Sequence, residues 1–320
     1  MRAAMVTALT GPDAVEVQEQ PVPVPNRDQV LIDVEYAGVA FPDVLRSRGE
    51  YQQCPDLPFV PGCEVSGVVR GETAAFRAGQ RVAAMPMVGG FADTVAVDAH
   101  MVFPLPATLP FDKAAALPLN YLTAHFAFTR RTELKKGETV LVHGAAGGVG
   151  AAACQLAAAY GATVIAVVST PEKGEVARAA GARHVVPVEG FRDEARRLTD
   201  GRGVDVVVDP VGGHRFTDSL RSLAREGRVL VLGFTGREIP TVKVNRLLLT
   251  NTSVIGVASA EFWADDAGYA GQQWRDLMPL IESGAIDPPL GPEFALDDAG
   301  AAIRELDDRR AVGKVLIRMR

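Results

Sequence analysis

The sequence predicts an α/β protein with two domains, one built on a doubly wound parallel sheet and the other on a β-barrel or sandwich. Its 320 residues, at about 100 to 200 residues per domain, predict two domains. Residues 119–257 alternate β-branched runs with Ala-rich segments, whereas residues 1–118 are rich in Pro and carry short strand-like runs. We therefore expect the two domains to meet near residue 118.

The first 118 residues have the pattern of a β domain. Runs at 30–34, 64–69 and 94–97 are rich in Val and Ile and are separated by turn residues. Short runs of this kind, bounded by Gly and Pro, are typical of strands in a barrel or sandwich.

Residues 119–257 predict strands that alternate with helices. The predicted strands are 139–143, 163–168, 184–186, 204–209, 228–233 and 253–257. The predicted helices are 148–160, 171–180, 191–199, 215–223 and 244–249. Such alternation implies a parallel sheet covered on both faces, and six strands with five crossovers make one complete Rossmann nucleotide-binding domain.

The tail after residue 257 contains two predicted helices, 272–282 and 296–306, and one strand, 314–318. A single short strand cannot form a domain, so we expect the tail to fold back onto the first domain. The predicted domains are therefore 1–118 with 258–320, and 119–257.

Composition and charge exclude several classes of function. The net charge is −6, from 33 basic and 39 acidic residues, which makes a nucleic-acid partner unlikely because such proteins present a basic face. No apolar run approaches the ~20 residues that span a bilayer, and the first residues lack a secretory pattern. We expect a cytoplasmic protein. Its three cysteines do not cluster, so neither a disulfide framework nor a structural metal site is expected.

A glycine-rich turn follows the predicted strand 139–143 and opens a helix. Against the dinucleotide-binding pattern G-x-G-x-x-G, Ala145 takes the first position and Gly147 and Gly150 take the others. Glycine lets the backbone approach a pyrophosphate, and the helix N-terminus supplies free N–H groups. We predict cofactor contacts from Ala146, Gly147, Gly148, Val149 and Gly150; the alternative is a tight structural turn.

The residues after the second strand of this domain predict which nicotinamide cofactor is bound. NAD-binding folds usually carry an acidic residue about 20 residues past the glycines, where it binds the ribose 2′-hydroxyl. Here Ser169 stands in its place and Lys173 follows. A hydroxyl and an ammonium group suit a 2′-phosphate, so NADPH is the predicted cofactor. The alternative for Lys173 is an exposed cation on a helix.

Several segments together resemble the zinc-independent NADPH:quinone oxidoreductase family (zeta-crystallin-like) of the medium-chain dehydrogenase/reductase superfamily. The matching segments are 38–45, 49–51, 57–64, 145–150, 209–213 and 233–234. The resemblance implies a GroES-like catalytic domain, NADPH bound against the Rossmann domain, and hydride transfer to a quinone or small α,β-unsaturated carbonyl without a metal.

Departures from the superfamily pattern concern metal and substrate. Ala40, Cys63 and Leu119 stand where the zinc alcohol dehydrogenases have their catalytic ligands, and zinc needs three protein ligands to act as a Lewis acid. No metal is expected. Ala40 also replaces the Asn common in quinone oxidoreductases, which implies a more apolar pocket.

The resemblance implies roles for Tyr51 and Thr123, and position in the predicted sheet suggests roles for three further residues. Tyr51 lies where related enoyl thioester reductases have a proton donor; the alternative is a turn tyrosine that packs against Pro58 and Phe59. Thr123 matches a residue that hydrogen-bonds near the nicotinamide amide; the alternative is helix capping. Gly233 and Phe234 follow the fifth strand, at the carboxyl edge where open α/β sheets bind ligands, although Phe234 is also explained by packing. Asp209, which ends the fourth strand, is expected to cap the next turn.

Two other functions remain open at this stage. An enoyl-CoA reductase, of acryloyl or crotonyl type, predicts a basic rim for the CoA phosphates, to which Arg46, Arg48 and Arg246 could contribute. The other alternative function is that of a non-catalytic NADPH-binding protein.

The apolar run 253–257 would be an exposed sheet edge in a monomer, so we predict a homodimer.

Overall fold

The computed structural model describes residues 1–319, which divide into two compact units. The first contains Met1–Leu119, Asp266–Arg275 and 290–319; the second contains Asn120–Asp265 and Asp276–Pro289. This division differs from the predicted boundaries in the tail, because 258–265 and 276–289 belong to the second unit. Hydrogen bonds explain part of the difference: the Gln155 Nε2 donates to the Asp287 carbonyl (2.6 Å), and the Asp287 N–H donates back to Gln155 Oε1 (3.1 Å).

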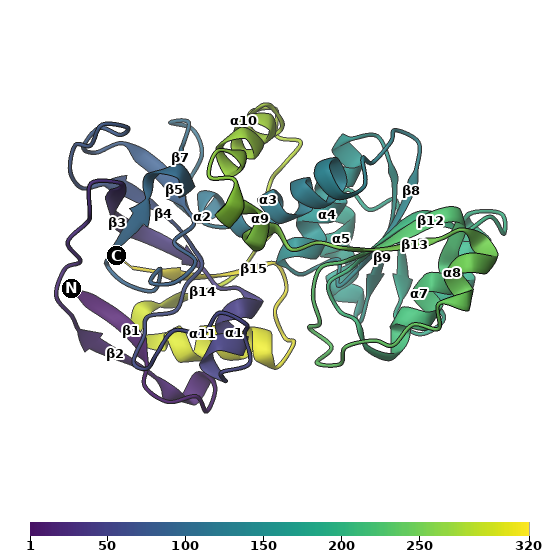
Figure 1. Ribbon diagram of the computed structural model, residues 1–320, viewed down its shortest axis with the longest axis horizontal. Helices are drawn as coiled ribbons and strands as arrows, with labels where there is room; N and C mark the ends of the chain where they lie inside the picture. The colour runs from purple at the N-terminus through teal and green to yellow at the C-terminus, as the bar shows by residue number, and fades with distance from the viewer. Residues whose placement is uncertain (320) are drawn as a thin grey trace. The chain divides into compact units, whose positions relative to one another are not determined.

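The first unit is built on a seven-stranded sheet, accompanied by a two-stranded sheet (Figure 1). Its main path runs β14-β15-β3-β4-β5-β7, and β6 pairs with β3. The small sheet pairs β1 with β2. The strands are β1 (Arg2–Val6), β2 (Val15–Glu19), β3 (Gln29–Gly38), β4 (Glu64–Val69), β5 (Arg81–Ala84), β6 (Thr94–Asp98), β7 (Val102–Pro104), β14 (Leu290–Ala295) and β15 (Lys314–Arg318).

The final strand β15 lies in the large sheet of the first unit. It pairs antiparallel with β3, with Leu316 opposite Gly38, and parallel with β14. Three helices belong to this unit: α1 (Phe41–Ser47), α2 (Phe111–Ala114) and α11 (Ala299–Asp307). Short 3₁₀ turns are η1 (Pro12–Ala14), η2 (Ala99–Met101) and η5 (Leu296–Asp298).

The second unit is a parallel six-stranded sheet in the order β10-β9-β8-β11-β12-β13. All five neighbouring pairs are parallel, which confirms the predicted doubly wound sheet. The strands are β8 (Thr139–His143), β9 (Thr163–Val168), β10 (His184–Pro187), β11 (Val204–Asp209), β12 (Leu223–Val231) and β13 (Ser253–Gly256).

Helices connect the strands of the second unit, where the sequence predicted them. These are α4 (Gly148–Ala159), α5 (Pro171–Ala179), α6 (Phe191–Leu198), α7 (Phe216–Ser222) and α8 (Asn245–Thr250). The other helices and turns of this unit are α3 (Pro118–Phe126), the π-helical turn η3 (Ala127–Arg131), the turn η4 (Gly213–Arg215) and α9 (Ser259–Asp265). The helix α10 (Tyr269–Glu282) is divided, with residues up to Arg275 in the first unit and the rest in the second. No helix in residues 1–319 is long and apolar enough to cross a membrane.

The core of the second unit explains its sequence pattern. Leu141, Val207 and Val229 are fully or almost fully buried beside one another on β8, β11 and β12. Because helices cover both faces, these strands are apolar throughout rather than alternating. The helix α4 is buried from Gly150 to Ala157, and its small side chains let it lie close to the sheet.

Candidate cofactor and catalytic residues

The glycine-rich turn joins the carboxyl end of β8 to the start of α4. Gly147 is the N-cap of α4, has an extended backbone, and has no side-chain cap. The turn closes with the Gly147 N–H donating to the Gly144 carbonyl (2.9 Å). The first N–H groups of an α-helix have no partner within the helix, so this end presents free donors and the positive end of the helix dipole.

The glycines in this turn differ in how much space the structure leaves for a side chain. A Cβ on Gly150 would lie 2.1 Å from the Gly144 oxygen, so only glycine allows the helix to approach the turn. On Gly148 it would lie 2.7 Å from the Asn120 side chain. On Gly147 the nearest atom would be 3.4 Å away, an ordinary contact. The fold therefore requires Gly150, whereas packing of the chain leaves Gly147 free to vary.

Ser169 and Lys173 lie at the carboxyl end of β9, at the same edge of the sheet as the glycine turn. Ser169 is exposed and Lys173 is half-buried in the first turn of α5. Thr170 caps this helix, because its hydroxyl accepts the Lys173 N–H (3.3 Å). This cap was not predicted from the sequence, although a Thr directly before Pro171 is a recognisable signal.

Asp209 is a structural residue at the end of β11, as predicted. One carboxylate oxygen accepts the N–H groups of Val211 and Gly212, both at 2.8 Å. Burial raises the pKa of Asp209, against the effect of these two donors. The carboxylate thereby holds the loop that follows the strand.

Gly233 and Phe234 lie in the next loop, after β12, and both are half-buried. Phe234 Cδ1 lies 2.9 Å from the position of a Cβ on Gly212. Its ring therefore packs on the loop held by Asp209. The segments after β8, β9 and β12, which were predicted to bind cofactor, lie at one edge of a single sheet.

Thr123 lies on α3, in the same unit as the glycine turn. Its hydroxyl is 3.0 Å from the hydroxyl of Ser259, at the start of α9. Phe262 of α9 also packs against Phe126 of α3, with ring centroids 5.2 Å apart. The predicted cofactor residue is thus held from α9, a contact between residues 136 positions apart that sequence analysis missed.

In the first unit, the carboxylate of Asp43 organises the start of α1. It accepts the N–H groups of Ala40 and Gly62, both at 2.9 Å, and is fully buried. Burial raises the pKa of Asp43, opposed by these donors and by Arg46. This carboxylate brings the Ala40 and Cys63 segments together.

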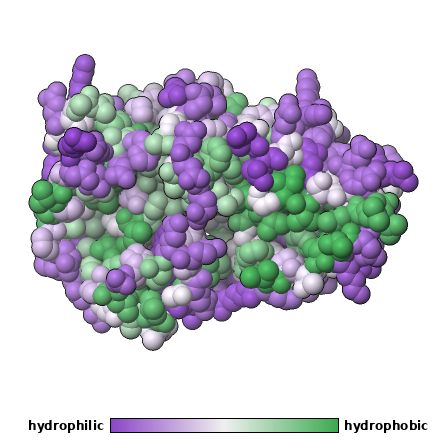
Figure 2. All heavy atoms as spheres, in the orientation of Figure 1, coloured by the Kyte–Doolittle hydropathy of each residue, from purple (hydrophilic) through white to green (hydrophobic). Residues whose placement is uncertain are grey.

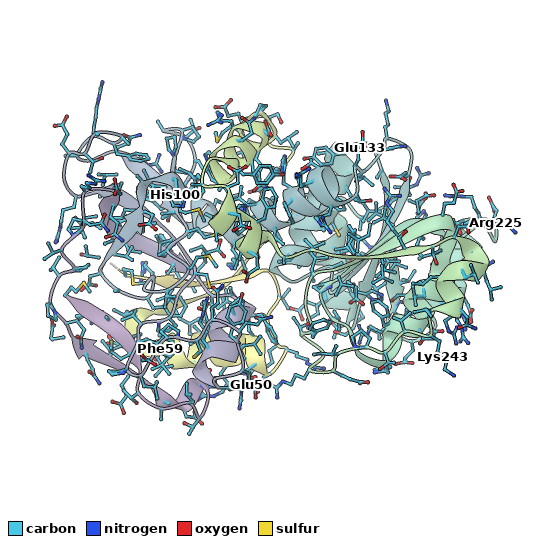
Figure 3. The ribbon with its side chains drawn as sticks, in the orientation of Figure 1. Glu50, Phe59, His100, Glu133, Arg225 and Lys243 are labelled. Atoms are coloured by element: carbon cyan, nitrogen blue, oxygen red, sulfur yellow. The ribbon has the colours of Figure 1, made fainter. Side chains whose placement is uncertain are left out.

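Arg46 is fully buried on α1 and its guanidinium faces Cys63 and Tyr51. The sequence-based hypothesis that Arg46 contributes to an exposed basic rim is therefore wrong. Arg48 is bound to Asp307. Tyr51 is half-buried, with its ring centroid 4.6 Å from the Arg46 guanidinium carbon. Figure 3 labels Glu50, the neighbour of Tyr51, near α1.

A buried ion pair lies beside this cluster. Glu64 is paired with Lys314 of β15 and also accepts the Leu119 N–H (2.9 Å). Burial raises the pKa of Glu64, and Lys314 opposes that effect. Among residues 1–319, no three His, Cys, Asp or Glu side chains lie where they could hold a metal ion.

A GroES-like unit combined with a Rossmann unit defines the medium-chain dehydrogenase/reductase class. The family description "Alcohol dehydrogenase GroES-like domain" matches residues 26–107, and "Zinc-binding dehydrogenase" matches residues 148–283. The mouse (Mus musculus) quinone oxidoreductase-like protein 2 is 36% identical, with 100% of this chain and 92% of the relative covered.

Solved structures agree with this classification. The quinone oxidoreductase of Thermus thermophilus, solved alone and with NADPH, superposes with a TM-score of 0.88 at 34% identity, and both chains are covered completely. The quinone oxidoreductase of Escherichia coli, complexed with NADPH, gives a TM-score of 0.92 at 28% identity, again over both full chains. This chain belongs to the quinone oxidoreductase family of medium-chain reductases, the branch that does not depend on zinc.

Proposed function

We propose that this protein is an NADPH-dependent oxidoreductase that transfers hydride to a quinone or a small α,β-unsaturated carbonyl without a metal. The observation that carries the proposal is the glycine turn at the carboxyl edge of the Rossmann sheet, in a chain whose relatives include NADPH complexes. The turn has the free N–H groups and the open approach at Gly147 that a pyrophosphate requires.

The residues of the second unit fit NADPH. We assign the pyrophosphate to the backbone of Ala146, Gly147, Gly148, Val149 and Gly150, at the uncapped start of α4. In this proposal two side chains after the end of β9, Ser169 and Lys173, bind the 2′-phosphate. The residue that directly follows β9 is a serine rather than a carboxylate, which would repel the phosphate; Glu172, which lies between the two residues in the sequence, is on α5 and is exposed.

In this proposal three residues contact the nicotinamide end of the cofactor: Thr123, Gly233 and Phe234. Gly233 has room around it, since the nearest atom to a Cβ there would be the Pro210 oxygen at 3.5 Å. The Thr123 and Ser259 hydroxyls share one hydrogen bond, which leaves one of their two hydrogens to be donated to a ligand.

The chemistry divides between the cofactor and this chain. Bound NADPH supplies the hydride, and the protein orients the acceptor and excludes water. As the acceptor gains hydride, an electron pair moves onto its oxygen. In this proposal the Tyr51 hydroxyl donates a proton to that oxygen, and water later returns a proton to the tyrosinate. General acid catalysis of this kind typically contributes about 10²–10⁴-fold.

The enoyl-CoA alternative loses support from the structure. Its predicted basic rim had three candidate residues, of which Arg46 is fully buried and Arg48 is engaged by Asp307. Only Arg246, which is half-buried on α8, remains. We therefore favour an acceptor without a phosphate tail.

We also propose a homodimer formed through the free edge of the Rossmann sheet. The strand β13 is the last strand of that sheet. Exposed apolar residues lie on β13 (Val254), on α8 (Leu248 and Leu249) and in the segment before α8 (Ile239 and Val244), with exposed fractions of 36% to 78%. Figure 2 shows apolar side chains gathered over α8 and β13. A second copy paired along β13 would cover this surface and satisfy the strand edge.

The decisive experiment is NADPH oxidation against a panel of benzoquinone, a naphthoquinone, an alkenal and crotonyl-CoA. We expect turnover with a quinone or the alkenal and a preference for NADPH over NADH. Turnover confined to crotonyl-CoA would replace the proposed acceptor class. Tight NADPH binding without turnover on any acceptor would identify a non-catalytic NADPH-binding protein.

A further inference from the structure

Arg46 is the largest charged side chain buried completely in the first unit. Its Nη1 donates to the Met87 carbonyl (2.7 Å) and to Cys63 Sγ (3.1 Å), and its Nε donates to the Gln53 carbonyl (3.2 Å). Burying a guanidinium is costly unless its donors are used. An uncharged side chain would fill the same space without that cost, so the charge calls for an explanation.

The electrostatic surroundings keep Arg46 charged. Burial lowers the pKa of Arg46, but its polar neighbours, among them the Asp43 carboxylate, raise it by more. Burial raises the pKa of the Cys63 thiol, so this residue is a neutral partner at pH 7. Glu64, another buried ionisable group near Arg46, forms an ion pair with Lys314. The guanidinium is therefore a cation whose neighbouring carboxylate, Asp43, already accepts two backbone N–H groups.

The segment 49–54, which carries Tyr51, is attached to Arg46 at both ends. At its start, the Gly49 N–H donates to the Arg46 carbonyl (3.0 Å). At its end, Gln53 receives the Arg46 Nε–H, and the Cys54 thiol donates to the Arg46 carbonyl (3.6 Å). Between these points the Tyr51 ring lies over the guanidinium at 4.6 Å, within the range of a cation–π contact.

We infer that Arg46 is a positioning residue for Tyr51: it clamps the segment 49–54 and stacks on the phenol ring, so that the Tyr51 hydroxyl is presented to the acceptor. This inference rests on the proton-donor role proposed for Tyr51. The contact also has an electrostatic consequence, because a cation against the ring favours the tyrosinate that remains after the proton has been donated.

The test compares Arg46→Lys with a matched control, Arg81→Lys. Lysine keeps the charge but loses the planar fork that bonds Gln53, Met87 and Cys63 together. Arg81 lies in the same unit, stacks on Phe111 at 4.4 Å and donates to backbone carbonyls including that of Pro106. It is thus the same type of contact away from Tyr51. Both variants are made alone and combined with Tyr51→Phe.

The kinetic expectation is specific to kcat. Arg46→Lys should lower kcat on the best acceptor by about 10-fold or more, since it removes the alignment of a general acid. The KM for NADPH should stay within about 2-fold, because the proposed cofactor residues are in the other unit. In the Tyr51→Phe background Arg46→Lys should add less than about 2-fold, whereas Arg81→Lys should have little effect in either background.

A second measurement does not depend on catalysis. Hydrogen exchange of the peptide covering 49–54 should become faster in Arg46→Lys and unchanged in Arg81→Lys. If Arg46→Lys does not fold, Tyr51→Leu removes the ring from the same stack and should loosen the same peptide, whereas Tyr51→Phe should not.

The outcomes separate this inference from the proposed function. Unchanged turnover in Tyr51→Phe would show that Tyr51 is not the proton donor, which overturns the proposed role and the inference with it. A reduced turnover in Tyr51→Phe, with Arg46→Lys equally harmful in both backgrounds or harmless in the wild type, would overturn only the positioning role of Arg46.

Discussion

Two of the three glycines at the start of α4, Gly147 and Gly150, allow a sharp test of the proposed cofactor site. Both occupy the glycine-rich turn, but a Cβ on Gly150 would lie 2.1 Å from a backbone oxygen, whereas a Cβ on Gly147 would have its nearest neighbour at 3.4 Å. Gly147 also has an extended backbone, which alanine adopts without strain. Gly150→Ala should therefore damage the fold, and Gly147→Ala should damage only the approach of a ligand.

The expected magnitudes differ accordingly. Overpacking costs about 1–3 kcal/mol, and because the atoms around Gly150 are backbone, we expect about 3 kcal/mol. At about 2–4 °C per kcal/mol for a unit of this size, the melting temperature of Gly150→Ala should fall by about 6–12 °C. Without cofactor, Gly147→Ala should melt within about 2 °C of the wild type.

Thermal melting with and without NADPH provides the assay. At 100 times its Kd, NADPH should stabilise the wild type by about 2.7 kcal/mol, which is a rise of about 5–10 °C. Gly147→Ala should bind NADPH at least about 10-fold more weakly by titration, and should therefore lose about half of this rise or more. Wild-type affinity in Gly147→Ala would refute the close approach of the pyrophosphate to this turn.

Three further predictions follow from the second unit and its surface. His143 is fully buried, and burial lowers its pKa to about 3. Below about pH 6.5 the unfolded chain therefore binds a proton that the folded protein does not, so the free energy of unfolding should fall by about 1.4 kcal/mol per pH unit below 6.5. Urea titrations of His143→Gln should show a weaker dependence of this free energy on pH. Lys173→Ala should raise the KM for NADPH by about 10-fold and leave that for NADH unchanged, while Lys136→Ala, at the opposite end of the strands, should change neither. Leu248→Glu should convert the dimer to a monomer in sedimentation experiments, whereas Val24→Glu, which alters an exposed apolar residue of the first unit, should leave the oligomeric state unchanged; a monomeric wild type would contradict the proposed dimer.

Local patterns predicted the second unit well because its elements depend on local chemistry. The strand 139–143 and the helix start at Gly148 were predicted at the residues where the structure has them, since an apolar run followed by glycines is a local signal. The strand β12 was predicted from 228 but begins at Leu223. Leu223 pairs with Val204 of β11, where the register between the two strands is irregular. The sequence of one segment alone does not reveal such pairing with another strand.

Distant contacts account for what was missed at the candidate sites. The placement of 276–289 depends on the Gln155 amide, 132 positions from Asp287. The Thr123–Ser259 contact joins two helices that the sequence presents as unrelated. Asp209 was assigned correctly as a cap, because its partners are only two and three residues away.

The sequence by itself determined the parallel sheet, the glycine turn and the residue types at positions 40, 63 and 119, because periodicity and identity are properties of neighbouring residues. Only the tertiary structure decided that Arg46 is a buried cation in contact with Tyr51 rather than part of an exposed rim. A charged residue on a short helix is normally solvated. Its burial here depends on Cys63 and Met87, which reach it only when the chain has folded.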